Sequence, residues 1–168
     1  MSRPFEPVIG EIRQEAATTR RVLERVPEDK LGWKPHPKSM TLGQLAMHVA
    51  MIPGAITRLA AVDEFEVNPA SFAPPLPNTT AEILETLDSS IQAAEKYLGG
   101  VSESAAMANW RAVINGRELM SMPRATMVRA LMLNHWYHHR GQLSVYLRLL
   151  QVPVPSIYGP SADDNPFV

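Results

Sequence analysis

Five histidines and no cysteine define the chemistry open to this 168-residue chain. Without a thiol, disulfides, thiolate metal ligands and cysteine nucleophiles are excluded, so a metal ion would need His, Asp or Glu ligands. His135 and His139 are four residues apart, which on a helix stacks two imidazoles on one face and directs their nitrogens at one point. This spacing is typical of helical zinc sites and makes the pair a candidate for binding a divalent metal.

A third histidine, His48, lies in the middle of the apolar stripe of an earlier predicted helix. A single buried histidine is more often a core residue with one satisfied hydrogen bond than a metal ligand. Three buried imidazoles without a partner would leave unpaired nitrogens, whereas one cation satisfies them together. His138 shares a face with His135 at a spacing of three, so spacing alone leaves it open as the ligand. His139 lies within the apolar stripe and His138 at its edge, which favours His139 and leaves His138 as a flanking group.

The residues around these histidines suggest an open metal site. No Asp or Glu shares their stripe, which argues against a carboxylate-rich di-iron centre. Three neutral nitrogens leave a coordination position for water or substrate, as expected of a catalytic centre. Gln44, one turn before His48, and Gln142, near the same face, could orient a ligand or bound water, or could be plain solvent-facing polar residues. His36, in a proline-rich loop, is interpreted as exposed and without a role.

Composition excludes several other classes of function. Apolar residues make up 45% and charged residues 20%, values typical of a globular protein, and the length predicts a single domain over residues 1–168. A formal charge of −1 gives no general attraction to nucleic acid or anionic lipid. No membrane-spanning stretch, signal peptide, phosphate-binding loop or nucleophile elbow is visible. We expect a cytoplasmic protein with no nucleic-acid or membrane partner.

Clustered prolines separate the segments that must position the histidines. Apolar periodicity predicts helices over about 5–26, 41–61, 79–100 and 123–151, and therefore an all-α helix bundle. Thr41 and Gln44 match a capping box, and Pro53 predicts a kink in the second helix. Over residues 101–122, Asn115-Gly116 is typical of a hairpin turn, but a loop or an extra helical turn fits as well.

The fourth predicted helix carries a second apolar strip, displaced from the histidine stripe. It consists of Leu133, Trp136 and Leu147. The strip fits either a dimer interface or packing inside the same bundle, and we take the interface as the working hypothesis.

Two sequence motifs resemble those of one known family. The segment NHWYHHRGQL (134–143) looks like the hallmark of the DinB/YfiT-like family of putative metalloenzymes, whose last helix carries H-x-x-x-H-R-G-Q. The segment TLGQLAMH (41–48) is similar to that family's second helix, which ends in its first histidine. Trp33 before Pro35, and the tail over 154–163, also resemble members, so the likeness covers nearly the whole chain.

The resemblance implies a fold, a metal and a class of activity. It places the family's metal ligands on His48, His135 and His139, and it implies an up-down-down-up four-helix bundle, commonly dimeric, that holds zinc, nickel or a similar divalent ion. Relatives include S-transferases that use low-molecular-weight thiols and a mycothiol-dependent maleylpyruvate isomerase. We therefore expect a homodimeric metal-dependent enzyme, with thiol S-transfer to small electrophiles as the specific reaction. Metal-assisted hydrolysis and a non-catalytic stress protein that binds a metal or small ligand are the alternatives.

Overall fold

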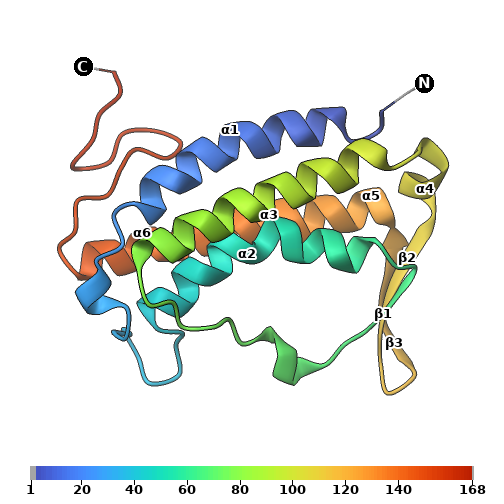
Figure 1. Ribbon diagram of the computed structural model, residues 1–168, viewed down its shortest axis with the longest axis horizontal. Helices are drawn as coiled ribbons and strands as arrows, with labels where there is room; N and C mark the ends of the chain where they lie inside the picture. Colours follow the sequence, from blue (N-terminus) through green and yellow to red (C-terminus); the bar gives the residue numbers. More distant parts are fainter. Residues whose placement is uncertain (1–2, 168) are drawn as a thin grey trace.

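Four long helical segments form most of the protein. The computed structural model describes residues 3–167, and Figure 1 shows these segments lying side by side. They are α1 (Glu6–Leu23), α2 (Leu42–Ala60), α3 (Thr80–Gly100) and a composite segment that ends in α6 (His135–Leu149). In Figure 1, α2 and α3 run in one direction and α1 and α6 in the other. The four predicted helices are thus confirmed within a few residues, and no helix in the described range is long and apolar enough to span a membrane.

The start and the middle of α2 follow from its sequence. Gln44 N–H donates to Thr41 Oγ1 over 3.1 Å and Thr41 N–H donates to Gln44 Oε1 over 3.0 Å, which confirms the capping box. Pro53 lies inside the helix, which changes direction near its middle in Figure 1. The next residue, Gly54, donates its N–H to Ser90 Oγ of α3 over 2.8 Å. The proline and glycine therefore mark a close approach of α2 to α3.

The last long segment is not the uniform α-helix that the periodicity predicted. It consists of α5 (Arg124–Met127), the π-helical segment η3 (Val128–Asn134) and α6. A π-helix has a wider turn than an α-helix. Over a segment of about two turns, the apolar periodicity of the sequence cannot distinguish the two kinds of helix. The π-helical segment ends directly before His135, and such segments often occur at functional sites.

The fold is mostly helical, as predicted, but it is not purely α-helical, because the protein also has a three-stranded sheet. The strands are β1 (Glu64–Glu66), β2 (Asn109–Ile114) and β3 (Arg117–Pro123), in the order β1-β2-β3. β2 and β3 form the hairpin that was one of three alternatives, with positive φ angles of 49° and 74° at Asn115 and Gly116. β1 pairs parallel with β2. Short helical elements complete the chain: η1 (Glu28–Lys30), η2 (Pro69–Phe72) and α4 (Glu103–Met107).

The sheet is fixed to the carboxyl end of α2. Trp110 of β2 is buried and donates its indole N–H to the Leu59 carbonyl over 3.0 Å. The buried Arg124 donates to the Ala60 carbonyl over 2.6 Å and forms a 2.5 Å ion pair with Asp63. These contacts satisfy carbonyls that a helix end leaves without partners. They also hold β1 beside the last turns of α2.

The second apolar strip of the last helix does not form an interface. Leu133, Trp136 and Leu147 are each 0% exposed within the single chain. The strip therefore packs inside the protein, and its assignment as a dimer interface was wrong. The physical reason is that the last segment is covered by neighbouring helices on more than one side, so a second apolar strip is part of the core.

Candidate metal centre

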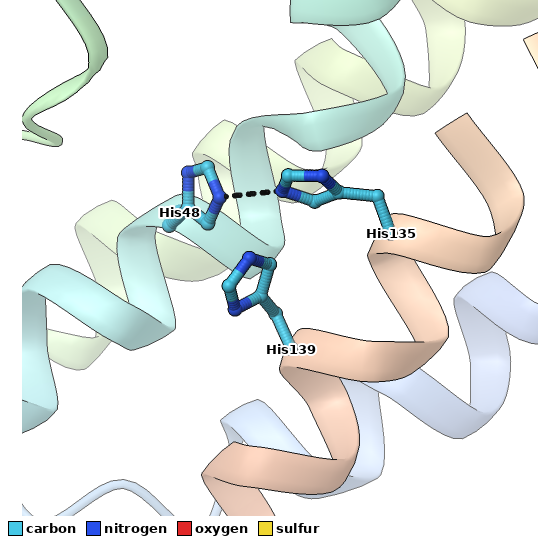
Figure 2. Close-up of side chains that lie close together, drawn as sticks. All are labelled: His48, His135 and His139. Atoms are coloured by element: carbon cyan, nitrogen blue, oxygen red, sulfur yellow. Dashed lines mark hydrogen bonds between the residues drawn. The ribbon is translucent and has the colours of Figure 1, made fainter. Parts of the chain in front are cut away.

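The structure brings the three predicted histidines together. His48 lies in the middle of α2, His135 is the first residue of α6, and His139 follows one turn later. Figure 2 shows the three rings pointing toward one another from these two helices. The Nε2 atoms of His48 and His135 are 3.0 Å apart, and one ring nitrogen from each histidine lies within 4.8 Å of the others. This geometry is compatible with one metal ion held between the three rings.

The cluster is held in its neutral form. Burial, together with the charges that His139 and His135 would carry, lowers the pKa of His48 to about 4. Burial and the neighbouring His139 and His138 likewise lower the pKa of His135 to about 4. Burial also lowers the pKa of His139, although its hydrogen bond to Gln142 opposes the shift. Neutral imidazole is the form that binds metal ions, so all three rings have lone pairs available at neutral pH.

A hydrogen bond from His139 to Gln142 orients one of the rings. His139 Nδ1 lies 2.7 Å from Gln142 Oε1, and because an amide oxygen only accepts, the Nδ1–H must be the donor. This places the proton on Nδ1 and leaves the lone pair on Nε2 of His139. Such outer hydrogen bonds fix the ring orientation of metal-binding histidines. Gln142 is itself exposed, so its contact with His139 leaves its role in orienting a metal ligand as a prediction.

The other predicted polar residues lie outside the cluster. Gln44 uses its side-chain oxygen in the capping box, and in the described residues no hydrogen bond links it to the three histidines. His138 is exposed, with its ring centroid 4.9 Å from that of His139, and is not a member of the cluster. His36 is exposed, and its Nδ1 accepts from the Lys38 N–H. The structure therefore places His139, and not His138, in the cluster.

The histidine cluster borders a mostly apolar cavity of about 340 Å³. Apart from His48 and Arg58, its wall on the α2 side consists of apolar residues on one face of the helix: Met51, Ile52, Ala55, Ile56 and Leu59. Phe65 of β1 and residues 72–74 cover the opposite side. His48 and His135 line the cavity directly, so a ligand bound there would contact the cluster. Sequence reasoning missed the cavity, because its cover comes from a strand and a loop without recognisable periodicity.

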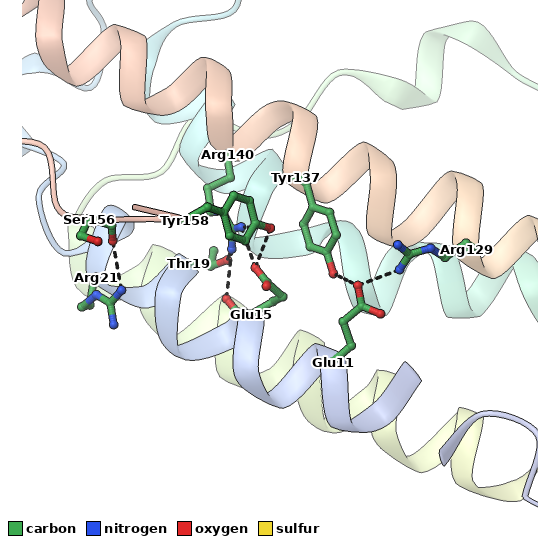
Figure 3. Close-up of polar contacts among 9 residues, drawn as sticks. All are labelled: Glu11, Glu15, Thr19, Arg21, Arg129, Tyr137, Arg140, Ser156 and Tyr158. Atoms are coloured by element: carbon green, nitrogen blue, oxygen red, sulfur yellow. Dashed lines mark hydrogen bonds and ion pairs between the residues drawn. The ribbon is translucent and has the colours of Figure 1, made fainter. Parts of the chain in front are cut away.

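A buried arginine directly after His139 ties three parts of the chain together. Arg140 is 1% exposed and forms a 2.6 Å ion pair with Glu15 of α1. It also donates to Thr19 Oγ1 over 3.0 Å and to the Tyr158 hydroxyl over 2.6 Å (Figure 3). Tyr158 in turn donates to Glu15 over 3.0 Å. This network fixes α6 and the C-terminal segment against α1, and its only sequence signal was the arginine that follows His139 in the family-like motif.

A second ion pair connects the last helical segment to α1 closer to the solvent, from η3 rather than α6. Arg129 lies 2.7 Å from Glu11, and Tyr137 donates its hydroxyl to the same carboxylate over 2.7 Å (Figure 3). Burial and the adjacent Glu11 raise the pKa of Tyr137 above its usual value, so the phenol stays protonated. The side chains of Arg129 and Glu11 are 51% and 36% exposed, in contrast to the Arg140 pair.

Comparison with known proteins decides the family. The sequence profile of the DinB family matches residues 1–165. The chain belongs to the DinB family. It is also 28% identical over 152 residues to a protein of Bacillus subtilis described as uncharacterized protein YrdA, with 89% of this chain and 85% of YrdA covered.

Solved structures of DinB-like proteins share the fold. A DinB-like protein from Bacillus cereus matches with a TM-score of 0.66 and 24% identity, covering 86% of this chain and 91% of its own. The DinB-like protein YjoA from Bacillus subtilis matches with a TM-score of 0.64 and 16% identity, covering 87% and 93%. A structure from Exiguobacterium sibiricum, described as a putative DinB family member, matches with a TM-score of 0.59 and 19% identity, covering 95% and 96%.

Proposed function

We propose that this DinB-family protein is a metal-dependent enzyme that holds one divalent ion, zinc or nickel, at His48, His135 and His139. The observation that carries the proposal is the convergence of three neutral imidazoles, with nitrogens within 4.8 Å of one another, two of which line a 340 Å³ cavity. Imidazole nitrogens suit zinc and nickel, and a set of three leaves room for a further ligand. The arrangement of helix directions supports an up-down-down-up four-helix bundle as the scaffold.

Thiol S-transfer to small electrophiles is the reaction we propose for this site. When bound, a divalent cation stabilises a thiolate over a thiol and polarises an acceptor beside it. The chain has no cysteine, so the thiol must enter as a cosubstrate. The apolar wall of the cavity would hold the electrophile and exclude water, while His48 and His135 lie at the same wall. A cytoplasmic setting fits this proposal, because low-molecular-weight thiols are kept reduced there.

The test compares turnover with and without metal. A model electrophile is offered with glutathione, bacillithiol and mycothiol in turn to the metal-free, zinc and nickel forms of the protein. We expect metal-dependent consumption of both substrates, lost in His48→Ala and kept in His36→Ala, which removes an exposed histidine outside the cluster. Equal rates in metal-free and metal-loaded protein with every thiol would refute metal-dependent transfer.

Two other outcomes would select the alternatives. Hydrolysis of an ester or amide without thiol would identify a metal-dependent hydrolase. A stoichiometric thermal shift by a ligand, with no turnover under any condition, would identify a binding protein.

We also propose a homodimer, as the family resemblance implies. The buried strip of the last helix is excluded as the interface, so the contact must use another face. Light scattering at micromolar concentration should give about twice the 18.6 kDa mass of the chain. A monomer mass under these conditions would contradict this part of the proposal.

A further inference from the structure

The cavity beside the histidine cluster extends along α2 beyond the cluster. Its α2 residues recur at intervals of three and four from His48 to Leu59, which places them on one side of the helix. Phe65 of β1 and residues 72–74 lie over this side. The lining of this cavity, which we call the channel, therefore runs along about three turns of α2, with the histidines at one end and the last turn of the helix at the other.

The charge at the second end of this channel has no partner. Arg58 lines the cavity, its residue is exposed, and within residues 3–167 it has no ion pair and no side-chain hydrogen bond. No aspartate or glutamate lines the cavity, so its only formally charged group is this guanidinium. A long apolar wall that ends in an unpaired cation is complementary to a molecule with an apolar body and one anionic end.

We propose that the channel binds an elongated apolar carboxylic acid, with the carboxylate on Arg58 and the apolar chain along α2 toward the histidines. A carboxylate fits because one guanidinium binds it through two parallel hydrogen bonds, whereas the lining offers no second arginine or lysine for a more highly charged group. Ten residues separate His48 from Arg58, which on a helix is about 15 Å, or roughly the length of a ten-carbon acid. The cavity volume of 340 Å³ lies within the usual range for small-molecule sites.

This inference rests on the proposed function only where it makes the distal end of the acid the reacting end. The distal end of the acid would then lie near His48 and His135, where the proposed reaction takes place. Binding itself depends on the apolar wall and on Arg58 and needs no metal ion. Metal-free protein can therefore test the binding site separately from the proposed reaction.

The experiment is calorimetric titration of metal-free protein with hexanoate, octanoate and decanoate. We expect affinity to rise about fourfold with each added methylene, because each one is buried against the apolar wall. Octanol and octylamine should bind at least about tenfold more weakly than octanoate, since neither can pair with a guanidinium. Arg58→Gln should weaken octanoate binding about tenfold and remove its preference over octanol. Arg25→Gln should change nothing, because Arg25 is also exposed but lies outside the cavity.

A second variant tests the channel itself. Ala55→Phe places a large side chain in the cavity wall and should abolish octanoate binding while the helical circular dichroism stays unchanged. Octanoate affinity in Arg58→Gln equal to that of the wild type would overturn the inference. Binding that appears only in zinc-loaded protein and survives Arg58→Gln would also overturn it, because the carboxylate would then lie on the metal. Arg58-dependent octanoate binding in a protein that takes up neither zinc nor nickel when these ions are supplied would sustain the inference and contradict the proposed function instead.

Discussion

Replacing Arg140 with methionine should destabilise the protein far more than replacing Arg129. Both arginines connect the last helical segment to a glutamate of α1, but Arg140 is 1% exposed and its partner's side chain is 9% exposed. The Arg140→Met change keeps an apolar stem of similar length and removes the charge. Glu15 is then left buried without its cation, and the hydroxyls of Thr19 and Tyr158 lose a charged donor.

The size of the effect follows from the difference in burial. Removing one partner of a buried ion pair costs about 3–5 kcal/mol, because the remaining charge is uncompensated. The pair of Arg129 and Glu11 is 51% and 36% exposed, and such pairs contribute about 0–1 kcal/mol. For a protein of this size 1 kcal/mol shifts the melting temperature by about 2–4 °C. Arg140→Met should thus lower it by roughly 10 °C, and Arg129→Met by roughly 2 °C.

The assay is thermal and urea-induced unfolding at neutral pH, followed by circular dichroism, for Arg140→Met, Arg129→Met and Glu15→Gln and for the double variant Glu15→Gln/Arg140→Met. The double variant should recover part of the loss, because the buried carboxylate charge is removed with its partner. The reasoning would be refuted if Arg140→Met and Arg129→Met lost the same free energy of unfolding. The reasoning would also fail if the two changes were additive. In that case the double variant would lose the free energy of unfolding lost by Arg140→Met plus that lost by Glu15→Gln alone.

Three further predictions concern the cluster and the helix contact. The pKa of His48 and His135 is about 4 in the folded protein against about 6.5 in the unfolded chain, so the unfolded chain binds more protons between these values. Urea titrations of metal-free protein should therefore show a free energy of unfolding that is constant above pH 6.5 and falls as the pH drops from 6.5 to 4. A free energy of unfolding independent of pH over this window would contradict the lowered pKa values of the two histidines. Gln142→Ala should weaken zinc binding about tenfold in a competition titration, since the hydrogen bond that fixes one ligand ring is lost; an unchanged Kd would argue against that role. Gly54→Ala should cost about 1–3 kcal/mol, because its Cβ would lie 3.1 Å from the backbone of α3, whereas Gly10→Ala, with open space around it, should stabilise α1 by about 0.5–1 kcal/mol. Equal effects of the two glycine changes in thermal melts would contradict the close approach.

The helices and the histidine cluster were predictable because their signals are local. Apolar periodicity predicted the helices, and the capping box at Thr41 marked the start of α2. The spacing of His135 and His139 placed two rings on one face of the last helix. His48 could be added because it lies in the middle of the apolar stripe of α2. The choice between His138 and His139 needed only the position of each relative to the buried face, and the structure agrees with it.

The parts that sequence reasoning missed depend on contacts between distant segments. β1 has only three residues and pairs with β2, more than 40 residues later, so neither its length nor its polarity marked it as a strand. Without β1, the cover of the cavity and the position of Arg58 at its end could not be foreseen. The buried network of Arg140 escaped notice because its partners lie on the first helix and in the C-terminal segment, about 120 and 18 residues away.

The most direct test of the central claim is the metal content of purified protein and of single histidine variants, measured by elemental analysis. We predict about one zinc or nickel ion per chain in the wild type and in His138→Ala. We predict loss of the ion in His48→Ala, His135→Ala and His139→Ala, with helical content largely retained, because each removes one of three converging ligands. Full metal retention in His48→Ala and His139→Ala, or loss in His138→Ala alone, would contradict the assigned centre.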